Sequence, residues 1–257
     1  MRTHFNLSAA EYEACRSGAV EQRRRRLVRA EIDALSGIKR TVELGCGPGR
    51  FLAELAHDYP HIEFTGIDIN PGMIEHAQRR YQTANLRYEL LDITTSDHLT
   101  GMDFAFSIDV LHHIHDLATF FQAVHRSMCP AGVWLAIEPN VYHPYIYYSQ
   151  ERMRRAGFDE DHFRPWVAEP LLARAGFTIS RRGFVSIFPG AIRRLPRPLE
   201  WFEQCCENWP FLGGSVVYRL ISQINSGCEA PTAVLAALSP TPVVDCGCAA
   251  AEIESAS

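Results

Sequence analysis

The chain has 257 residues, of which 47% are hydrophobic and 21% charged, and a chain of this size and composition can bury a substantial core. Its 25 lysine and arginine residues against 30 acidic residues give a net charge of −5, which gives no indication of a nucleic-acid partner. Apolar runs fall well short of the roughly 18 residues of a membrane-spanning helix, and the N-terminus lacks the apolar segment of a signal peptide, so we expect a cytoplasmic location.

The first predicted element is a helix over residues 17–35, because apolar side chains recur near one face of that segment. Four consecutive arginines, residues 23–26, point in several directions around this helix. Such a run is typical either of a solvated surface or of a contact with phosphate or an anionic membrane. Peripheral membrane contact therefore remains one of two interpretations.

A glycine-rich loop then follows a short apolar run and precedes a helical pattern over residues 50–59. It reads Glu43-Leu-Gly-Cys-Gly-Pro-Gly49, with glycines at alternate positions. Glycine allows positive φ in a sharp turn, and without a Cβ atom it lets a ligand lie against the backbone. The order of strand, turn and helix is that of a nucleotide-sized binding site.

The next apolar run, residues 62–68, ends in a carboxylate 23 residues after Gly45. At about this separation, the acid that ends the second strand of a doubly wound sheet accepts hydrogen bonds from ribose hydroxyls. Asn70 is a suitable helix cap, and Pro71 fits the first turn of a helix over residues 71–82. Asp68 is therefore predicted to lie at the carboxyl edge of the sheet, beside the glycine loop.

These features together resemble a class I S-adenosylmethionine-dependent methyltransferase of the bacterial small-molecule or lipid type. The resemblance rests on Glu43, the following Gly-x-Gly-x-Gly, and the strand ending Gly-Ile-Asp68. Nicotinamide-dependent oxidoreductases usually carry Gly-x-Gly-x-x-Gly, so the early third glycine disfavours them. The resemblance is strong over residues 41 to about 138, looser to about 220 and absent beyond.

The resemblance also implies which residues bind S-adenosylmethionine. Leu90-Leu-Asp92-Ile-Thr is similar to the third-strand motif whose acid meets the adenine, and residues 103–113 are similar to the fourth-strand motif beside the methionine moiety. The implied cofactor-binding residues are Glu43, Gly45, Cys46, Gly47, Gly49, Asp68, Ile69, Asp92, Ile93, Ser107 and His112.

Helical patterns alternate with apolar runs from residue 41 to about 138, which favours a parallel sheet covered on both faces. Residues 215–221 resemble the last, antiparallel strand of the methyltransferase sheet. We therefore predict an α/β fold of the Rossmann-like methyltransferase type, with a doubly wound, mostly parallel seven-stranded sheet, a final antiparallel strand and a cap over the C-terminal sheet edge.

A single domain is expected over residues 1–221. It divides into an N-terminal helical segment (1–40), a cofactor-binding core (41–138), and a substrate cap with the last helices (139–214). The cap is rich in aromatic residues, which either wall a substrate pocket or pack as a lid. Residues 222–257 form an appended acidic tail and a candidate for disorder, because residues 220–257 hold four acidic and no basic side chains.

Eight cysteines show no paired framework, and a chain without a secretion signal is expected to keep them reduced. No regular pair of Cys-x-x-Cys motifs indicates a zinc site, so we expect no metal. Cys46 is interpreted as part of the loop wall rather than as a reactive thiol. Arsenite methylation, which would use thiols, remains a competing function.

The predicted reaction is methyl transfer from S-adenosylmethionine to a hydroxyl or carbon nucleophile of a small or lipid-like molecule. A hydroxyl needs a base, and imidazole titrates near neutrality. His143, in the cap, is the first candidate and His113 the second. A noncatalytic S-adenosylmethionine-binding regulatory protein would carry the same cofactor motifs, and a nicotinamide-dependent oxidoreductase is a less favoured interpretation.

Overall fold

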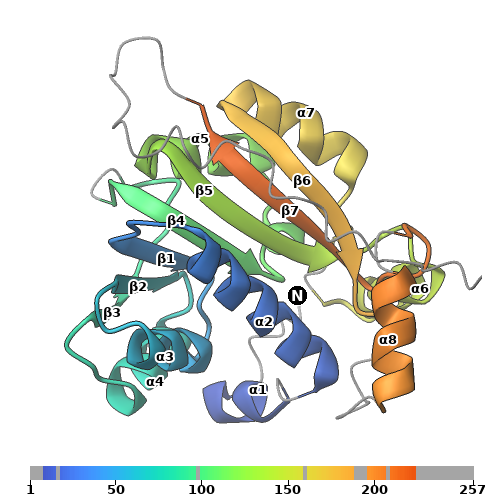
Figure 1. The fold of residues 1–257 in the computed structure, drawn as a ribbon, viewed down its shortest axis with the longest axis horizontal. Coiled ribbons are helices and arrows are strands. Elements are labelled where there is room, and N and C mark those ends of the chain that lie inside the picture. Colours follow the sequence, from blue (N-terminus) through green and yellow to red (C-terminus); the bar gives the residue numbers. More distant parts are fainter. Residues whose placement is uncertain are drawn as a thin grey trace, which may run out of the picture.

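A computed structural model describes residues 8–15, 18–96, 99–158, 161–187, 196–206 and 209–223 (Figure 1). The predicted acidic tail lies outside the described residues from residue 224 onward, and so do Cys228, Cys246 and Cys248. The proposed division into segments therefore stays a prediction.

The described chain is built around one seven-stranded sheet in the order β3-β2-β1-β4-β5-β7-β6. Strand β7 pairs antiparallel with both β5 and β6, and the other neighbouring strands pair in parallel. The strands are β1 (Arg40–Leu44), β2 (Glu63–Asp68), β3 (Leu86–Leu90), β4 (Met102–Ile108), β5 (Met128–Pro139), β6 (Phe177–Val185) and β7 (Ser215–Ser222). The predicted mostly parallel sheet with a final antiparallel strand is confirmed.

Helices cover both faces of this sheet, as Figure 1 shows. The described helices are α1 (Ala9–Cys15), α2 (Ala19–Ala34), α3 (Arg50–Asp58), α4 (Pro71–Arg80), α5 (Leu117–Ser127), α6 (Pro144–Arg155), α7 (Pro165–Ala175) and α8 (Arg197–Cys206), with a short 3-10 turn η2 (Leu111–His113). One core cluster joins α2, α3 and α4 to one face, and a second joins α5 and α7 to the other. Burial on both faces explains why the strands read as nearly continuous apolar runs.

Strand β5 carries the largest side chain of the core, Trp134, which is fully buried. Its ring lies against Phe121 of α5 and Phe177 of β6, with ring centroids 5.8 and 5.5 Å away. Its Nε1 donates a hydrogen bond of 3.2 Å to the hydroxyl of Ser107 on β4. The aromatic packing and this bond fix β4 and β5 side by side at the point where both strands approach the site.

The carboxyl ends of the parallel strands meet at one edge of the sheet. Helix α6 follows β5 there, and α8 precedes β7 there because β7 runs in the opposite direction. Figure 1 shows α6 and α8 together beyond this edge. The sheet is thus a rigid scaffold, and the loops and added helices at its carboxyl edge can form a binding site.

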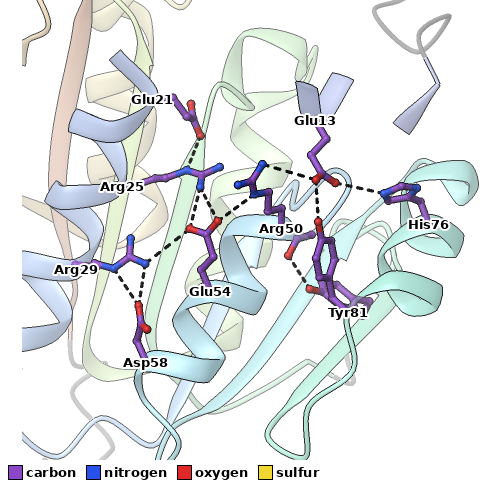
Figure 2. Close-up of polar contacts among 11 residues, drawn as sticks. Glu13, Glu21, Arg25, Arg29, Arg50, Glu54, Asp58, His76 and Tyr81 are labelled. Carbon is purple, nitrogen blue, oxygen red and sulfur yellow. Dashed lines mark hydrogen bonds and ion pairs between the residues drawn. The ribbon is translucent and has the colours of Figure 1, made fainter. Parts of the chain in front are cut away.

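The arginine run of α2 is only partly exposed to solvent, because two of its arginines bond to other side chains of the same chain. Arg24 is only 8% exposed: its Nη1 donates to Asp109 at 2.6 Å, and its Nη2 donates to the hydroxyl of Ser215 at 2.9 Å. Arg25 donates to Glu54 of α3 at 2.9 Å (Figure 2). These arginines attach α2 to the sheet edge and to α3, and only Arg26 of the four is exposed.

Helix α4 begins as the sequence predicts, with Asn70 as its cap. The Asn70 side chain accepts hydrogen bonds from the amides of Gly72 at 2.9 Å and Met73 at 3.3 Å. We expect Asn70→Ala to cost about 1 kcal/mol, which lowers the melting temperature of a domain of this size by about 2–4 °C. Asn70→Asp keeps the acceptor and should melt near the wild type, so equal losses in both variants would contradict the capping role.

Candidate functional site

A cavity of about 360 Å³ lies at the carboxyl edge of the sheet, between the loops that follow β1, β2, β3 and β4. Helices α1, α4 and α5 each contribute side chains to its wall. The lining residues are Tyr12, Leu44, Gly45, Gly47, Ile67, Asp68, Ile69, Met73, Leu91, Asp92, Ile93, Thr94, Ile108, Asp109, Val110, His113, Ile114, His115, Asp116 and Phe120. This is the edge at which open α/β sheets bind ligands.

The glycine loop forms one wall, and its three glycines have positive φ of 71°, 52° and 80°. Gly45 and Gly47 line the cavity. The amides of Gly45 and Cys46 both donate to the carbonyl of Ile67, at 2.8 and 2.9 Å, which holds the loop against β2. A Cβ atom on Gly45 would lie 2.6 Å from a methyl group of Val110, so the loop and the segment after β4 are in close contact there.

The other members of the glycine motif lie behind the loop rather than on the main cavity. A Cβ atom on Gly49 would lie 2.6 Å from the ring of Tyr88, so this glycine allows packing under the start of α3. Glu43, Cys46 and Gly49 line a separate hollow of about 60 Å³. Burial and the nearby carboxylates of Glu43 and Asp68 raise the pKa of the Cys46 thiol well above its usual value, so the thiol stays protonated at neutral pH.

Asp68 ends β2 and connects the two loops on either side of it. Its Oδ2 accepts from the amide of Gly47 at 2.8 Å and its Oδ1 from the amide of Asn70 at 2.8 Å. Burial raises the pKa of this carboxyl, although the amide hydrogen bonds act in the opposite direction. A carboxylate has about four acceptor sites, so these two bonds leave capacity for hydroxyl groups in the cavity.

The loop after β3 supplies a second carboxylate and the apolar side chain of Ile93, and the loop after β2 adds Ile69. Asp92 accepts from the amide of Thr94 at 2.9 Å and from its hydroxyl at 2.6 Å, which fixes the turn. Ile93 is buried, whereas Ile69 is 61% exposed and lines the cavity with it. Apolar side chains beside a carboxylate suit a flat ring that carries an amino group, which is the character of adenine.

The segment after β4 is held by Glu138, a fully buried carboxylate at the end of β5. Its Oε1 accepts from the amides of Val110 at 2.9 Å and Leu111 at 2.8 Å. Its Oε2 lies 2.8 Å from Nδ1 of His112. Asp109, at the start of this segment, has φ of 57°, a conformation that few non-glycine residues adopt. Glu138 therefore fixes the segment that brings Asp109, Val110 and His113 to the cavity.

Two residues of the fourth-strand motif lie below this segment rather than on the cavity. Ser107 is fully buried, and its hydroxyl is engaged by Trp134. The His112 ring is 6% exposed, sits against Glu138, and has its centroid 4.0 Å from that of His113. Of the implied cofactor residues, the cavity lining includes Gly45, Gly47, Asp68, Ile69, Asp92 and Ile93.

The two base candidates occupy different positions. His113 lines the cavity, and so does His115 of the same segment. His143 instead caps α6, where its Nδ1 accepts from the amides of Tyr145 at 3.2 Å and Ile146 at 3.4 Å. His143 is not among the described residues that line the cavity, so this geometry favours His113 over His143 as the base.

The cap made by His143 should depend on pH, because burial lowers the pKa of this imidazole below its ordinary 6.5. A lowered histidine pKa means that the folded chain favours the neutral imidazole. The stability that this cap contributes is therefore present above about pH 6.5 and is lost as the pH falls through the lower pKa of the folded chain. Protonated Nδ1 has no lone pair to accept with. We expect the protection of the Tyr145 and Ile146 amides against hydrogen exchange, relative to the intrinsic rate at each pH, to fall as the pH falls from 7 to 5, whereas constant protection would contradict the cap. His143→Asn keeps an acceptor that does not titrate and should remove the pH dependence.

The cavity fits S-adenosylmethionine on two observations of the structure. Gly45 and Gly47 line the cavity without side chains, so a ligand can lie against their backbone. Asp68 and Asp92 offer acceptors for ribose and adenine, with Ile69 and Ile93 beside them. The sheet with its antiparallel β7 and the site at its carboxyl edge are those of the class I S-adenosylmethionine-dependent methyltransferase fold, and S-adenosylmethionine is the cofactor that this cavity suits.

Comparison with known proteins agrees with this class. Residues 42–134 match the family model described as "Methyltransferase domain". Malonyl-[acyl-carrier protein] O-methyltransferase of Acetivibrio thermocellus is 26% identical over 167 residues, which are 64% of this chain and 58% of the relative. Trans-aconitate 2-methyltransferase of Methylobacterium nodulans is 32% identical over 98 residues, which are 38% of this chain and 37% of the relative. The chain thus spans between about a third and three fifths of the length of these relatives.

A solved structure shows the same fold. N-methyltransferase NodS from Bradyrhizobium japonicum WM9, in complex with S-adenosyl-L-homocysteine, aligns with a TM-score of 0.59 at 17% identity. The alignment covers 85% of this chain and 96% of NodS. At this identity the likeness extends to the fold alone.

Two further findings concern membranes and metals. None of the helices that the structure describes combines the length and apolar character needed to span a bilayer. Within the same part of the chain, histidine, cysteine and acidic side chains do not gather in threes around a point where a metal ion would fit.

Proposed function

We propose that this protein transfers the methyl group of S-adenosylmethionine to a nucleophile on a small or lipid-like molecule. The observation that carries the proposal is the cavity itself, which joins the glycine loop, Asp68 and Asp92 at the edge of a methyltransferase sheet. When bound, the cofactor supplies a methyl group that is already activated by a positively charged sulfonium. The chain has to bind, align and shield the reactants, which can account for much of the lowering of the barrier.

Carboxylates around the cavity suit a positively charged cofactor. Asp68, Asp92, Asp109 and Asp116 all contribute to the lining. Arg24 lies 2.6 Å from Asp109, so the side of the cavity nearest the fourth-strand segment is partly neutralised. We place the ribose and adenine at Asp68 and Asp92, the methionine moiety with its sulfonium beside the fourth-strand segment, and the methyl acceptor nearer His113.

An oxygen nucleophile is the acceptor that these observations support best. One relative is named an O-methyltransferase, and another acts, by its name, on trans-aconitate, an acid. A hydroxyl acceptor would use His113 as its base, because this histidine lines the cavity. A carboxylate acceptor would need no base, since it is already ionised at neutral pH.

A lipid-like acceptor is supported by the surface of the cap. Among the described residues, the large apolar side chains that are exposed lie on α6, α7, α8 and the segment after α8, except for Ile69 and Leu90. The cap residues are Tyr145, Tyr147, Tyr148, Trp166, Val167, Leu199, Trp201, Phe202, Trp209 and Phe211. Exposed aromatic side chains concentrated on one part of a protein mark contacts with apolar partners or substrates.

The test is transfer of labelled methyl from S-adenosylmethionine to molecules in an extract of the source cells. We expect label in products below protein size, with the organic phase labelled for a lipid-like acceptor and the aqueous phase for a polar one. Loss of label under mild alkali would identify a methyl ester. Binding of S-adenosylmethionine without incorporation into any fraction would contradict the enzyme and favour a regulatory binding protein.

A further inference from the structure

Helix α1 contributes to the cavity although it precedes the sheet. None of its residues was assigned to the site from the sequence. Tyr12 lines both the main cavity and the small hollow behind the glycine loop. Its ring atom Cε1 lies 3.7 Å from the point that a Cβ atom on Gly47 would occupy. Tyr12 therefore stands over the part of the loop where a ligand would meet the backbone.

The neighbouring Glu13 attaches α1 to the body of the domain, as Figure 2 shows. Its Oε1 accepts from the hydroxyl of Tyr81 at 2.8 Å, and its Oε2 lies 3.3 Å from Nε2 of His76. Arg50, at the start of α3, places Nη1 3.9 Å from the same carboxylate. The Glu13 side chain is only 14% exposed, so these contacts are partly shielded from water.

The position of α1 depends on such contacts, because a helix of seven residues is too short to be stable alone. Its first turn has a local brace: the amide and hydroxyl of Ser8 donate to Glu11 at 2.9 and 2.7 Å. That brace is exposed and lies within the helix start itself. Glu13, in contrast, reaches α3 and α4, which begin directly after the two loops of the cofactor cavity.

We propose that Tyr12 is a cofactor-contacting residue and that Glu13 is its positioning residue. Glu13 holds α1 against Arg50, His76 and Tyr81, and α1 thereby holds the Tyr12 ring over Gly47. The ring covers the glycine side of the bound cofactor, keeps water from it and slows its dissociation. This inference rests on the proposed function of the cavity as an S-adenosylmethionine site.

The test measures the affinity and dissociation rate of S-adenosyl-L-homocysteine with the full chain. Tyr12→Ala is expected to weaken binding by about 10- to 100-fold, the scale of removing one buried aromatic contact. Tyr12→Phe keeps the ring and should stay within about 3-fold of the wild type. Glu13→Gln removes the charge and places an NH₂ group against one of the donors that the carboxylate accepts from. We therefore expect the ligand to dissociate about 5- to 10-fold faster.

Glu11→Gln is the matched control, because it removes the same charge from the exposed side of α1. A glutamine at this position still accepts a hydrogen bond at the start of the helix. It should bind like the wild type. If Glu13 acts through Tyr12, Glu13→Gln should change binding by less than about 2-fold in a Tyr12→Ala background. The melting temperature without ligand should stay unchanged in all of these variants, so that only the ligand-induced rise differs.

Each outcome separates the inference from the function on which it rests. A wild type that does not bind S-adenosyl-L-homocysteine contradicts the proposed function. A wild type that binds, with Tyr12→Ala and Glu13→Gln unchanged, overturns the inference and leaves the function standing. An equal effect of Glu13→Gln with and without Tyr12 overturns the positioning role.

Discussion

Gly45→Ala is expected to weaken S-adenosyl-L-homocysteine binding by at least about 100-fold, a loss of roughly 3 kcal/mol. The residue has φ of 71°, and an added Cβ atom would lie 2.6 Å from Cγ2 and 3.2 Å from Cγ1 of Val110. Val110 has little freedom to move away, because it is β-branched and its amide is held by Glu138. Relief of the contact must therefore displace one of the two loops that form the cavity. Calorimetric titration measures the loss.

Gly37→Ala separates this effect from backbone strain. Gly37 has a similar φ of 77°, but no heavy atom of the described residues lies within 4 Å of its added Cβ. We expect this variant to lose about 1 kcal/mol of folding stability and to bind the ligand like the wild type. If both variants bound the ligand equally, the proposed close contact between the glycine loop and Val110 would be wrong.

Glu138→Ala is the second change with a large expected effect. It leaves the amides of Val110 and Leu111 without their carboxylate acceptor and removes the partner of the His112 ring, all in a buried place. Loss of the acceptor for buried donors is expected to cost about 3 kcal/mol or more, which lowers the melting temperature by about 6–12 °C. Binding of S-adenosyl-L-homocysteine should fall with it, because the segment that carries Asp109 and Val110 is released.

Glu138→Gln serves as the graded control for this prediction. Its amide oxygen still accepts from Val110 and Leu111, and its NH₂ group meets His112 Nδ1, which then has to be an acceptor. We expect a melting temperature within a few degrees of the wild type and ligand binding about 10-fold weaker. Alanine and glutamine variants with the same melting temperature and affinity would show that Glu138 does not fix the segment.

The fold was largely predictable from sequence because its signals are local. Apolar runs that end at the glycine loop, Asp68 and Asp92 mark the strand ends, and Asn70 with Pro71 marks a helix start. Loops that follow parallel strands must share one edge, so the cavity follows from the order of elements. The same logic correctly brought Gly45, Gly47, Asp68 and Asp92 to one lining.

The residues that were missed act over long separations in the chain. Glu138 contacts amides 27 and 28 positions earlier, and Glu13 contacts a hydroxyl 68 positions later. Local periodicity contains no information about such pairs. Glu138 follows directly on a buried apolar run of β5. Since a buried charge needs partners, this position was the signal in the sequence that Glu138 holds other groups in place.

Charge and histidine patterns were misleading for a related reason. The run around Arg24 suggested either a solvated surface or a contact with phosphate or membrane, yet Arg24 pairs with Asp109, 85 residues away, and is buried. His143 stood out as a histidine in the cap, and the structure uses its Nδ1 to begin α6. In both cases the residue type was clear from sequence, but its partner was set by tertiary structure.

The ligand-binding expectations depend on the edge cavity binding S-adenosylmethionine rather than a dinucleotide. Calorimetric titration of the full chain with S-adenosylmethionine, S-adenosyl-L-homocysteine and NAD distinguishes the two. We predict binding of one molecule of either methyl-donor ligand per chain, loss of that binding in Gly45→Ala, and no response to NAD. Tight binding of NAD with no response to S-adenosylmethionine or S-adenosyl-L-homocysteine would contradict the assignment of this cavity.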